Sequence, residues 1–269
     1  MTGTGPDIQD NRGIDTTRPH PARVYDWYLG GKDNYPVDEE LGRRIASIDG
    51  GAAPRTARAN RAFMRRTTRA LAHTGIRQFL DIGTGIPTEP NLHQIAQSVT
   101  PDARVVYVDN DPIVLAHANA LLRGTAQGVT EYVQADARDP RTILERAAGV
   151  LDFGRPVALS LIALLHFVAD DDGAHDLVAT LVDALAPGSA LVLSAMTADF
   201  EPENVRQGIA AYAAGGVTLV ARSRAEVGAF FQGLELLEPG IVPVADWRPD
   251  EPPADGAPVS LYGAAALKH

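Results

Sequence analysis

Short apolar runs alternate with helical patterns along most of the chain after Gly75. Five runs predict strands, and they read IRQFLDIG, ARVVYVDND, TEYVQAD, PVALSLIALL and SALVLSAM. Asp111 and Asp139 each precede a proline and predict helix starts, because the carboxylate can cap and proline fits the first helical position. The capping-box pattern at 223–226 predicts a helix through Phe231. Near-continuous apolar strands separated by helices predict a doubly wound, Rossmann-like α/β sheet that is mostly parallel.

The first part of the chain follows a different pattern. Residues 1–22 are polar and lack a period, which predicts a mobile arm. Residues 23–75 carry helical patterns that break at Gly30 and end with a long helix stopping at Gly75. We therefore expect a helical cap over 23–75 and one main domain over 76–269. Two late apolar runs, LELLEPGIVPV and PVSLYGAAALK, predict a hairpin at the edge of the sheet.

Composition narrows the possible classes of function. The 269 residues are 45% hydrophobic, enough for one large core, and a net charge of −10 disfavours nucleic acid as a partner. The absence of cysteine excludes a disulfide scaffold, a thiolate metal site and a cysteine nucleophile. The longest apolar tract, 156–169, is shorter than the ~20 residues of a membrane span. We expect a cytoplasmic, metal-free protein without a membrane partner; nothing in the pattern indicates an oligomeric state.

The candidate chemistry begins where the first predicted strand ends, in QFLDIGTGIPT. In a doubly wound sheet, ligands bind outside the carboxyl ends of the strands, where Asp81, Gly83, Thr84 and Gly85 would lie. A dinucleotide-binding loop would have a third glycine at position 88, but this chain has Thr88. A carboxylate here repels a pyrophosphate and attracts positive groups, such as the ammonium and sulfonium of S-adenosylmethionine. An ordinary tight strand-to-helix turn is the alternative.

Two more acidic residues are expected at the ends of the next two strands. Asp109 follows Gly85 by 109 − 85 = 24 residues, close to the spacing of about 20 at which an acidic residue binds ribose hydroxyls. Asn110 is a further candidate in this group, and the second carboxylate of the DND stretch is assigned to the helix cap. Asp136 is predicted to accept a hydrogen bond from an adenine amine, with the backbone of Ala137 pairing with a ring nitrogen. Asp136 could instead end the strand or cap a turn.

Three carboxylates at successive strand ends, together with Asp-x-Gly-x-Gly, resemble the class I S-adenosylmethionine-dependent methyltransferases. The stretches RVYDWYLGGKDNY, NRAF, FLDIGTGIPT, VVYVDNDPIVLAHA and ADARDP look like the actinobacterial S-adenosylmethionine methyltransferase family once catalogued as a domain of unknown function. This resemblance spans roughly 23–269. It implies a seven-stranded sheet with a reversed last strand and a helical cap in front, and it brings no known acceptor.

Aromatic and polar residues of the cap are candidates for a lid over the cofactor. Tyr25, Gly31, Asn34 and Tyr35 belong to the stretch YDWYLGGKDNYP, and we expect them near the methionine moiety or the acceptor. The alternative is a helix-turn-helix connection in which Asp33 and Asn34 bond the local backbone.

Three residues are candidates for direct roles in binding or proton transfer. Arg61 could pair with the cofactor carboxylate through its planar fork, or lie on a solvated helix face. His166 follows the fourth predicted strand and could face the acceptor or pack in the core. His166 or Tyr35 could take a proton from a hydroxyl or amine acceptor. The sequence thus predicts an S-adenosylmethionine-dependent methyltransferase with a small-molecule acceptor. A non-catalytic sensor of that cofactor and a nicotinamide oxidoreductase are the alternatives.

Overall fold

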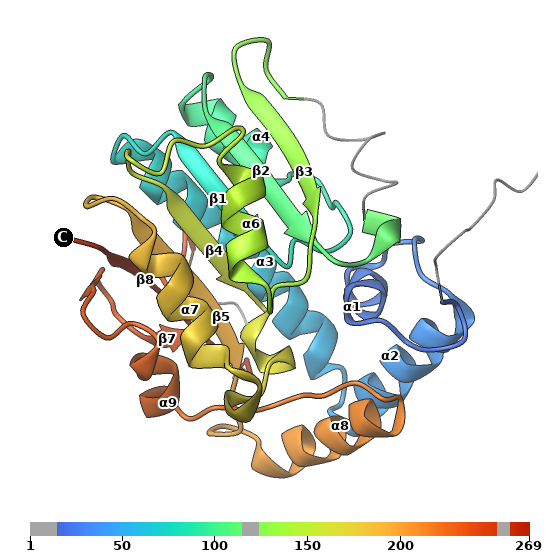
Figure 1. Cartoon of the computed structure of the whole chain (residues 1–269). Helices are drawn as coiled ribbons and strands as arrows, with labels where there is room; N and C mark the ends of the chain where they lie inside the picture. The colour runs from blue at the N-terminus through green and yellow to red at the C-terminus, as the bar shows by residue number, and fades with distance from the viewer. Residues whose placement is uncertain (1–14, 115–123, 252–258) are drawn as a thin grey trace, which may run out of the picture.

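The computed structural model describes residues 15–114, 124–251 and 259–269 (Figure 1). Most of the predicted N-terminal arm, residues 1–14, therefore lies outside the described residues. Parallel strands form the centre of the sheet: β1 (Gln78–Ile82), β2 (Arg104–Asp109), β3 (Val129–Gln134), β4 (Ala158–Ile162) and β5 (Ala190–Met196). Strand β8 (Leu261–Leu267) runs antiparallel to β5, which is the reversed last strand that the sequence resemblance implies.

The sheet order is β3-β2-β1-β4-β5-β8-β6, so β1 and β4 lie side by side at the point where the strand order reverses. Two short strands, β6 (Glu235–Leu236) and β7 (Val242–Pro243), both pair antiparallel with β8. The predicted edge hairpin is thus confirmed; one of its sides is the long strand β8, and the other consists of the two short strands β6 and β7. In the described part of the chain the sheet has eight strands, one more than predicted, because β6 and β7 are separate pieces.

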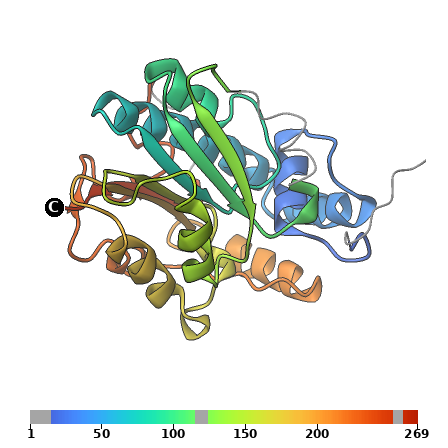
Figure 2. The ribbon, with the colours of Figure 1, turned by 45° about the horizontal axis from the view of Figure 1, so that its top comes forward.

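Helices cover both faces of the sheet, as predicted for a doubly wound fold (Figure 2). One face packs against α6 (Pro140–Ala147), α7 (Ala174–Asp183) and α9 (Arg224–Ala229). The other face packs against α3 (Ala52–His73) and α4 (Leu92–Val99). Strands β1, β4 and β5 are almost wholly buried between these layers, which explains why their sequences lack a polar alternation.

A helical cap lies over the carboxyl ends of the parallel strands. It consists of α1 (Pro21–Leu29), α2 (Pro36–Ile48), the start of α3, and α8 (Pro202–Ala214) from the second half of the chain. Helices α2 and α8, blue and orange in Figure 1, contact each other although they are far apart in sequence. The cap is tied to the sheet by His20, whose Nδ1 lies 3.1 Å from an Asp111 carboxylate oxygen.

Several predicted boundaries shift by a few residues. Helix α1 begins at Pro21, inside the predicted arm, and the helix of the predicted capping box ends at Ala229 rather than Phe231. Strand β4 stops at Ile162, because Ala163 takes a positive φ of 55° and a short 3₁₀ turn, η1 (Leu165–Phe167), follows. None of the helices in the described ranges is long and apolar enough to cross a membrane.

Candidate cofactor and acceptor site

A cavity of about 440 Å³ lies between the carboxyl ends of the parallel strands and the helical cap. Its lining comes from the ends of β1, β2 and β4, from the loop after β3, and from α1, α2, α3 and α8. This is the position at which doubly wound sheets bind their ligands. The candidate residues that line it are Tyr25, Arg61, Asp81, Gly83, Thr84, Gly85, Asp109, Asn110, Asp136, Ala137 and His166.

The loop after β1 is held against β2 by backbone hydrogen bonds. The amides of Gly83 and Thr84 both donate to the Val108 carbonyl, at 2.8 and 3.2 Å. Gly83 has a φ of 75°, and a Cβ there would lie 2.8 Å from a Leu164 methyl carbon, so glycine is required for two reasons. Gly85 has a φ of 67° and lines the cavity. The loop therefore brings main-chain groups close to a ligand.

Asp109 at the end of β2 is fixed by the backbone around it. One carboxylate oxygen accepts from the Gly85 amide at 2.8 Å, and the other accepts from the Asp111 amide at 3.0 Å. Because a carboxylate has about four acceptor positions, two remain for a ligand. Asp111 accepts from the Ile113 amide at 3.0 Å, which is the local capping contact predicted for it.

Asp81 and Asp109 create an unusual electrostatic environment. Burial raises the pKa of Asp81 from 3.8 to about 7, against the opposing effect of Arg61, and the nearby Asp109 charge raises it further. Burial also raises the pKa of Asp109, although its two backbone hydrogen bonds act in the opposite direction. Two desolvated carboxyl groups beside one cavity favour a positively charged ligand, because such a ligand stabilises both ionised forms.

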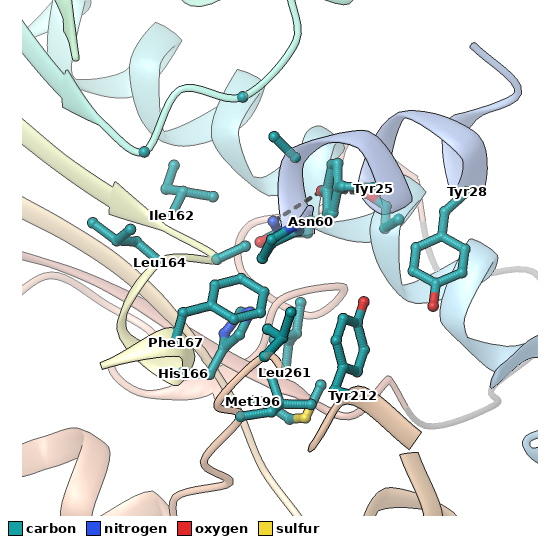
Figure 3. Close-up of a pocket in the computed structure, with 18 of the residues that line it drawn as sticks. Tyr25, Tyr28, Asn60, Ile162, Leu164, His166, Phe167, Met196, Tyr212 and Leu261 are labelled. Carbon is teal, nitrogen blue, oxygen red and sulfur yellow. Dashed lines mark hydrogen bonds between the residues drawn. The ribbon is translucent and has the colours of Figure 1, made fainter. Parts of the chain in front are cut away.

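A buried hydrogen-bond network supports the centre of the cavity. Asn60 on α3 donates to the Tyr25 hydroxyl at 3.0 Å, which in turn donates to the Ala57 carbonyl (Figure 3). The Asn60 side-chain carbonyl accepts from the Ser194 hydroxyl at 2.7 Å, and that hydroxyl accepts from the Ala163 amide. Tyr25 is therefore fixed to α3, and the network joins the cap to β4 and β5.

Arg61 on α3 lines the cavity and is held by the loop after β1. The Arg61 guanidinium donates to the carbonyls of Thr88 and Pro90, and its buried Nε makes no hydrogen bond within the described ranges.

Asp136, after β3, is more exposed to solvent. Its side chain is 48% exposed and accepts from the Arg138 amide at 2.9 Å. Asp136 thus forms the local turn that was its alternative interpretation, while its residue also lines the cavity.

His166 lies in η1 with 5% of its surface exposed. Burial lowers the pKa of His166 to about 3, and the positive charge of Arg222 lowers it in the same direction. Its Nδ1 is buried without a hydrogen-bond partner among the residues described. The imidazole is therefore neutral at physiological pH and is a weak proton acceptor.

The loop residues Gly31, Asn34 and Tyr35 are not part of the cavity lining. Asn34 donates to an Asp26 carboxylate oxygen at 2.8 Å and to the Gly31 carbonyl at 3.2 Å. A Cβ at Gly31 would lie 2.0 Å from the Asp26 carboxylate, and the Tyr35 ring packs 5.3 Å from the Arg23 guanidinium carbon. This arrangement favours the helix-turn-helix alternative for these three residues, and their place in a lid over the cofactor stays a prediction.

Comparison with known proteins adds to this geometry. A model of the family described as S-adenosyl methyltransferase matches residues 7–269. The chain belongs to the S-adenosyl methyltransferase family. It is 50% identical to a DUF574-family protein from Streptomyces avermitilis MA-4680, with a TM-score of 0.92 over 95% of this chain and 99% of the other. It is 38% identical to a proposed methyltransferase from Thermobifida fusca YX, with a TM-score of 0.89 over 97% and 99%. No curated protein matches the chain.

The protein is therefore an S-adenosylmethionine-dependent methyltransferase, and the nicotinamide alternative is wrong. The cavity suits the cofactor of the S-adenosyl methyltransferase family. Burial raises the pKa values of Asp81 and Asp109 beside the glycine loop, so a ligand with positive groups would stabilise their ionised forms. At Gly85 the closest atom to a Cβ would be 4.0 Å away, which leaves room for a ligand against the backbone.

Sequence reasoning missed the residues on the cap side of this methyltransferase cavity. Tyr28, Phe167, Gly208 and Tyr212 line it but lie on three elements, α1, η1 and α8, that are far apart in the sequence. No sequence motif around Gly208 or Tyr212 indicates a ligand site, because only the tertiary fold brings α8 next to the cavity. Tyr28 could have been found, since it belongs to the aromatic pattern of the first helix.

Proposed function

We propose that this methyltransferase acts on a small organic molecule that binds beneath the helical cap. The size and position of the cavity, about 440 Å³ between the strand ends and the helical cap, carry this proposal. Tyr28 and Tyr212 on the cap side are each only 7% exposed, and His166 is 5% exposed. A cavity of this kind admits a ligand of drug-like size, whereas a duplex or a folded protein surface needs an open face.

The two buried carboxylates are proposed to hold the cofactor through complementary groups. Asp109 has free acceptor positions for the ribose hydroxyls, since its backbone hydrogen bonds fix its orientation. Asp81 faces the same cavity and would pair with the cofactor ammonium. Arg61 has an unsatisfied buried Nε and is proposed to pair with the cofactor carboxylate.

The remaining candidates are proposed to contact the cofactor around these anchors. Gly83, Thr84 and Gly85 would approach through their backbone, and Asn110, which follows Asp109 and lines the cavity, is proposed to lie beside the ribose. Asp136 and Ala137 line the cavity at the end of β3 and are proposed to bind the adenine edge.

The bound cofactor supplies a methyl group on a positively charged sulfur, which keeps the electron pair of the S–C bond as the acceptor atom bonds to the carbon. The protein contributes by aligning the acceptor and excluding water. His166 is proposed to orient the acceptor as a neutral hydrogen-bonding group, because a pKa of about 3 makes it a poor store for a proton. The acceptor proton would leave to solvent only after the methyl transfer, so no side chain of the cavity needs to hold it.

Transfer of a labelled methyl group tests the proposal. The protein is incubated with methyl-labelled cofactor and a cell extract divided into a low-molecular-weight fraction and a macromolecular fraction. We expect label in the small molecules, and we expect it to be lost in Asp109→Ala but kept in Asp102→Ala. Asp102 is a surface residue paired with Arg77, so it controls for the loss of a carboxylate. Label confined to protein or nucleic acid would refute the proposal.

A further inference from the structure

The cavity has a second half that differs in chemistry from the cofactor side. We call it the cap compartment and define it by six lining residues: Tyr28, Ile45, Phe167, Met196, Tyr212 and Leu219. These side chains come from α1, α2, η1, the end of β5, α8 and the segment after α8. All six are apolar or aromatic, whereas the opposite half carries Asp81, Asp109 and the glycine loop.

Aromatic rings gather at the cap compartment (Figure 3). The rings of Phe167 and Tyr212 lie 6.3 Å apart at 62°, and His166 and Phe167 lie 4.4 Å apart. Aromatic rings attract other rings in offset or edge-to-face geometry, and they do so beyond the gain from burial alone. The walls therefore favour a flat, unsaturated ligand over an aliphatic one of the same size.

One buried polar group offers a specific contact to such a ligand. The Tyr28 hydroxyl is buried and makes no hydrogen bond of good geometry with any described residue. In Figure 3 it points toward the Tyr212 hydroxyl; burial raises the pKa of Tyr28, and the interaction with that phenol raises it further. Because the contact between the two phenols falls short of a regular hydrogen bond, a ligand that hydrogen-bonds to the Tyr28 hydroxyl is favoured.

The charges around the cap compartment disfavour an anionic ligand. Arginines Arg61 and Arg138 belong to the cofactor half, and in the described part of the chain no lysine or arginine lines the cap half. Asp49 lines it, but its carboxylate accepts three backbone hydrogen bonds at the start of α3. Glu201 adds a further negative charge at the start of α8. A carboxylate or phosphate would find no cationic side chain among the described residues of this half.

Gly208 keeps part of the compartment open. It lies in the middle of α8, where glycine weakens a helix relative to alanine. A Cβ at this position would meet no atom of the described residues within 4 Å, so packing does not require glycine. Because Gly208 also lines the cavity, a larger side chain would extend into free space.

We propose that the cap compartment is the acceptor site and that the acceptor is a neutral aromatic compound whose polar group hydrogen-bonds to Tyr28. The proposal rests on the proposed small-molecule methylation and deepens it by naming the class of substrate. The ring lies against Phe167 and Tyr212, and Gly208 leaves space for it.

Calorimetric binding of three probes to the full chain, with S-adenosylhomocysteine at saturation, tests the proposal. The probes are 2-naphthol, 2-naphthoate with the same rings but a negative charge, and cyclohexanol with a hydroxyl but no aromatic ring. We expect 2-naphthol to bind at least tenfold more tightly than either of the others. Tyr28→Phe should weaken its binding about fivefold, since it removes one neutral hydrogen bond.

Gly208→Leu should abolish 2-naphthol binding, and Gly208→Ala should retain it, while S-adenosylhomocysteine affinity stays within twofold in both. Tyr262→Phe is the matched control for Tyr28, because its hydroxyl bonds to Asp199 and the residue is not part of the cavity lining. Equal or tighter binding of 2-naphthoate or cyclohexanol would overturn the proposal, as would unchanged binding in both Gly208→Leu and Tyr28→Phe. Absent S-adenosylhomocysteine binding would instead refute the cofactor site itself.

Discussion

Replacing Asp81 by Asn should stabilise the ligand-free protein while weakening cofactor binding. In the folded state burial raises the pKa of Asp81 from 3.8 to about 7. The folded state therefore holds a proton between pH 4 and 7 that the unfolded chain releases, and stability falls as the pH rises through this window. A shift of about 3 units corresponds to about 4 kcal/mol of lost stability above pH 7.

The neutral amide of Asp81→Asn avoids this penalty but has its own cost of burial. We expect a net gain of about 2 kcal/mol at pH 8, equivalent to a rise in Tm of roughly 4–8 °C for a chain of this size. At pH 5 the wild-type carboxyl is mostly protonated and about 2.7 kcal/mol of the penalty is absent, so the gain should disappear. Saturating S-adenosylmethionine should reverse the order, because its positive groups stabilise only the carboxylate.

Thermal unfolding of both proteins at pH 5, 6, 7 and 8, with and without cofactor, measures these differences. Asp102→Asn is the matched control; it alters an exposed carboxylate and should change stability by less than about 0.5 kcal/mol. If Asp81→Asn is less stable than the wild type at pH 8, with no change between pH 5 and 8, the carboxylate is already compensated and the reasoning fails.

Three other predictions follow from the geometry of the site. Gly83→Ala should lower Tm and weaken S-adenosylmethionine binding at least tenfold, because a φ of 75° and a 2.8 Å contact both exclude a methyl group; an unchanged protein would contradict the loop geometry. Ser194→Ala should cost about 1–3 kcal/mol in chemical denaturation, since Asn60 loses its buried donor, and a cost below 0.5 kcal/mol would refute the network. By NMR, the His166 imidazole should stay neutral down to about pH 4. Stability should fall below pH 6.5, because the unfolded chain gains a proton that folded His166 does not bind; titration of His166 near pH 6.5 would disprove its burial.

The sheet and the cofactor half were predictable because their signals are local. An apolar run that ends in an acidic residue places that residue at the carboxyl end of a strand, and parallel strands bring Asp81 and Asp109 to one edge. The helix cap could be assigned to Asp111 rather than Asp109, because a proline directly follows Asp111. These inferences need only strand direction and helix-start chemistry.

The cap could not be predicted in the same detail. The polar loop after α1 suggested a ligand lid. In the structure, the Asp26 carboxylate instead accepts hydrogen bonds from the Asp33 amide and the Asn34 side chain of that loop. Conversely, Tyr212 and Gly208 reach the cavity only because α8 packs across α2, a contact between distant segments that no local pattern encodes.

The central claim is that buried carboxylates at the sheet edge hold the cationic cofactor. Isothermal titration of S-adenosylmethionine into the wild type and Asp109→Ala tests it most directly. We predict 1:1 binding to the wild type and at least a tenfold loss of affinity in the variant, since hydrogen bonds to a charged group contribute about 1.5–3 kcal/mol. Equal affinity in the two proteins, with both folded, would contradict it.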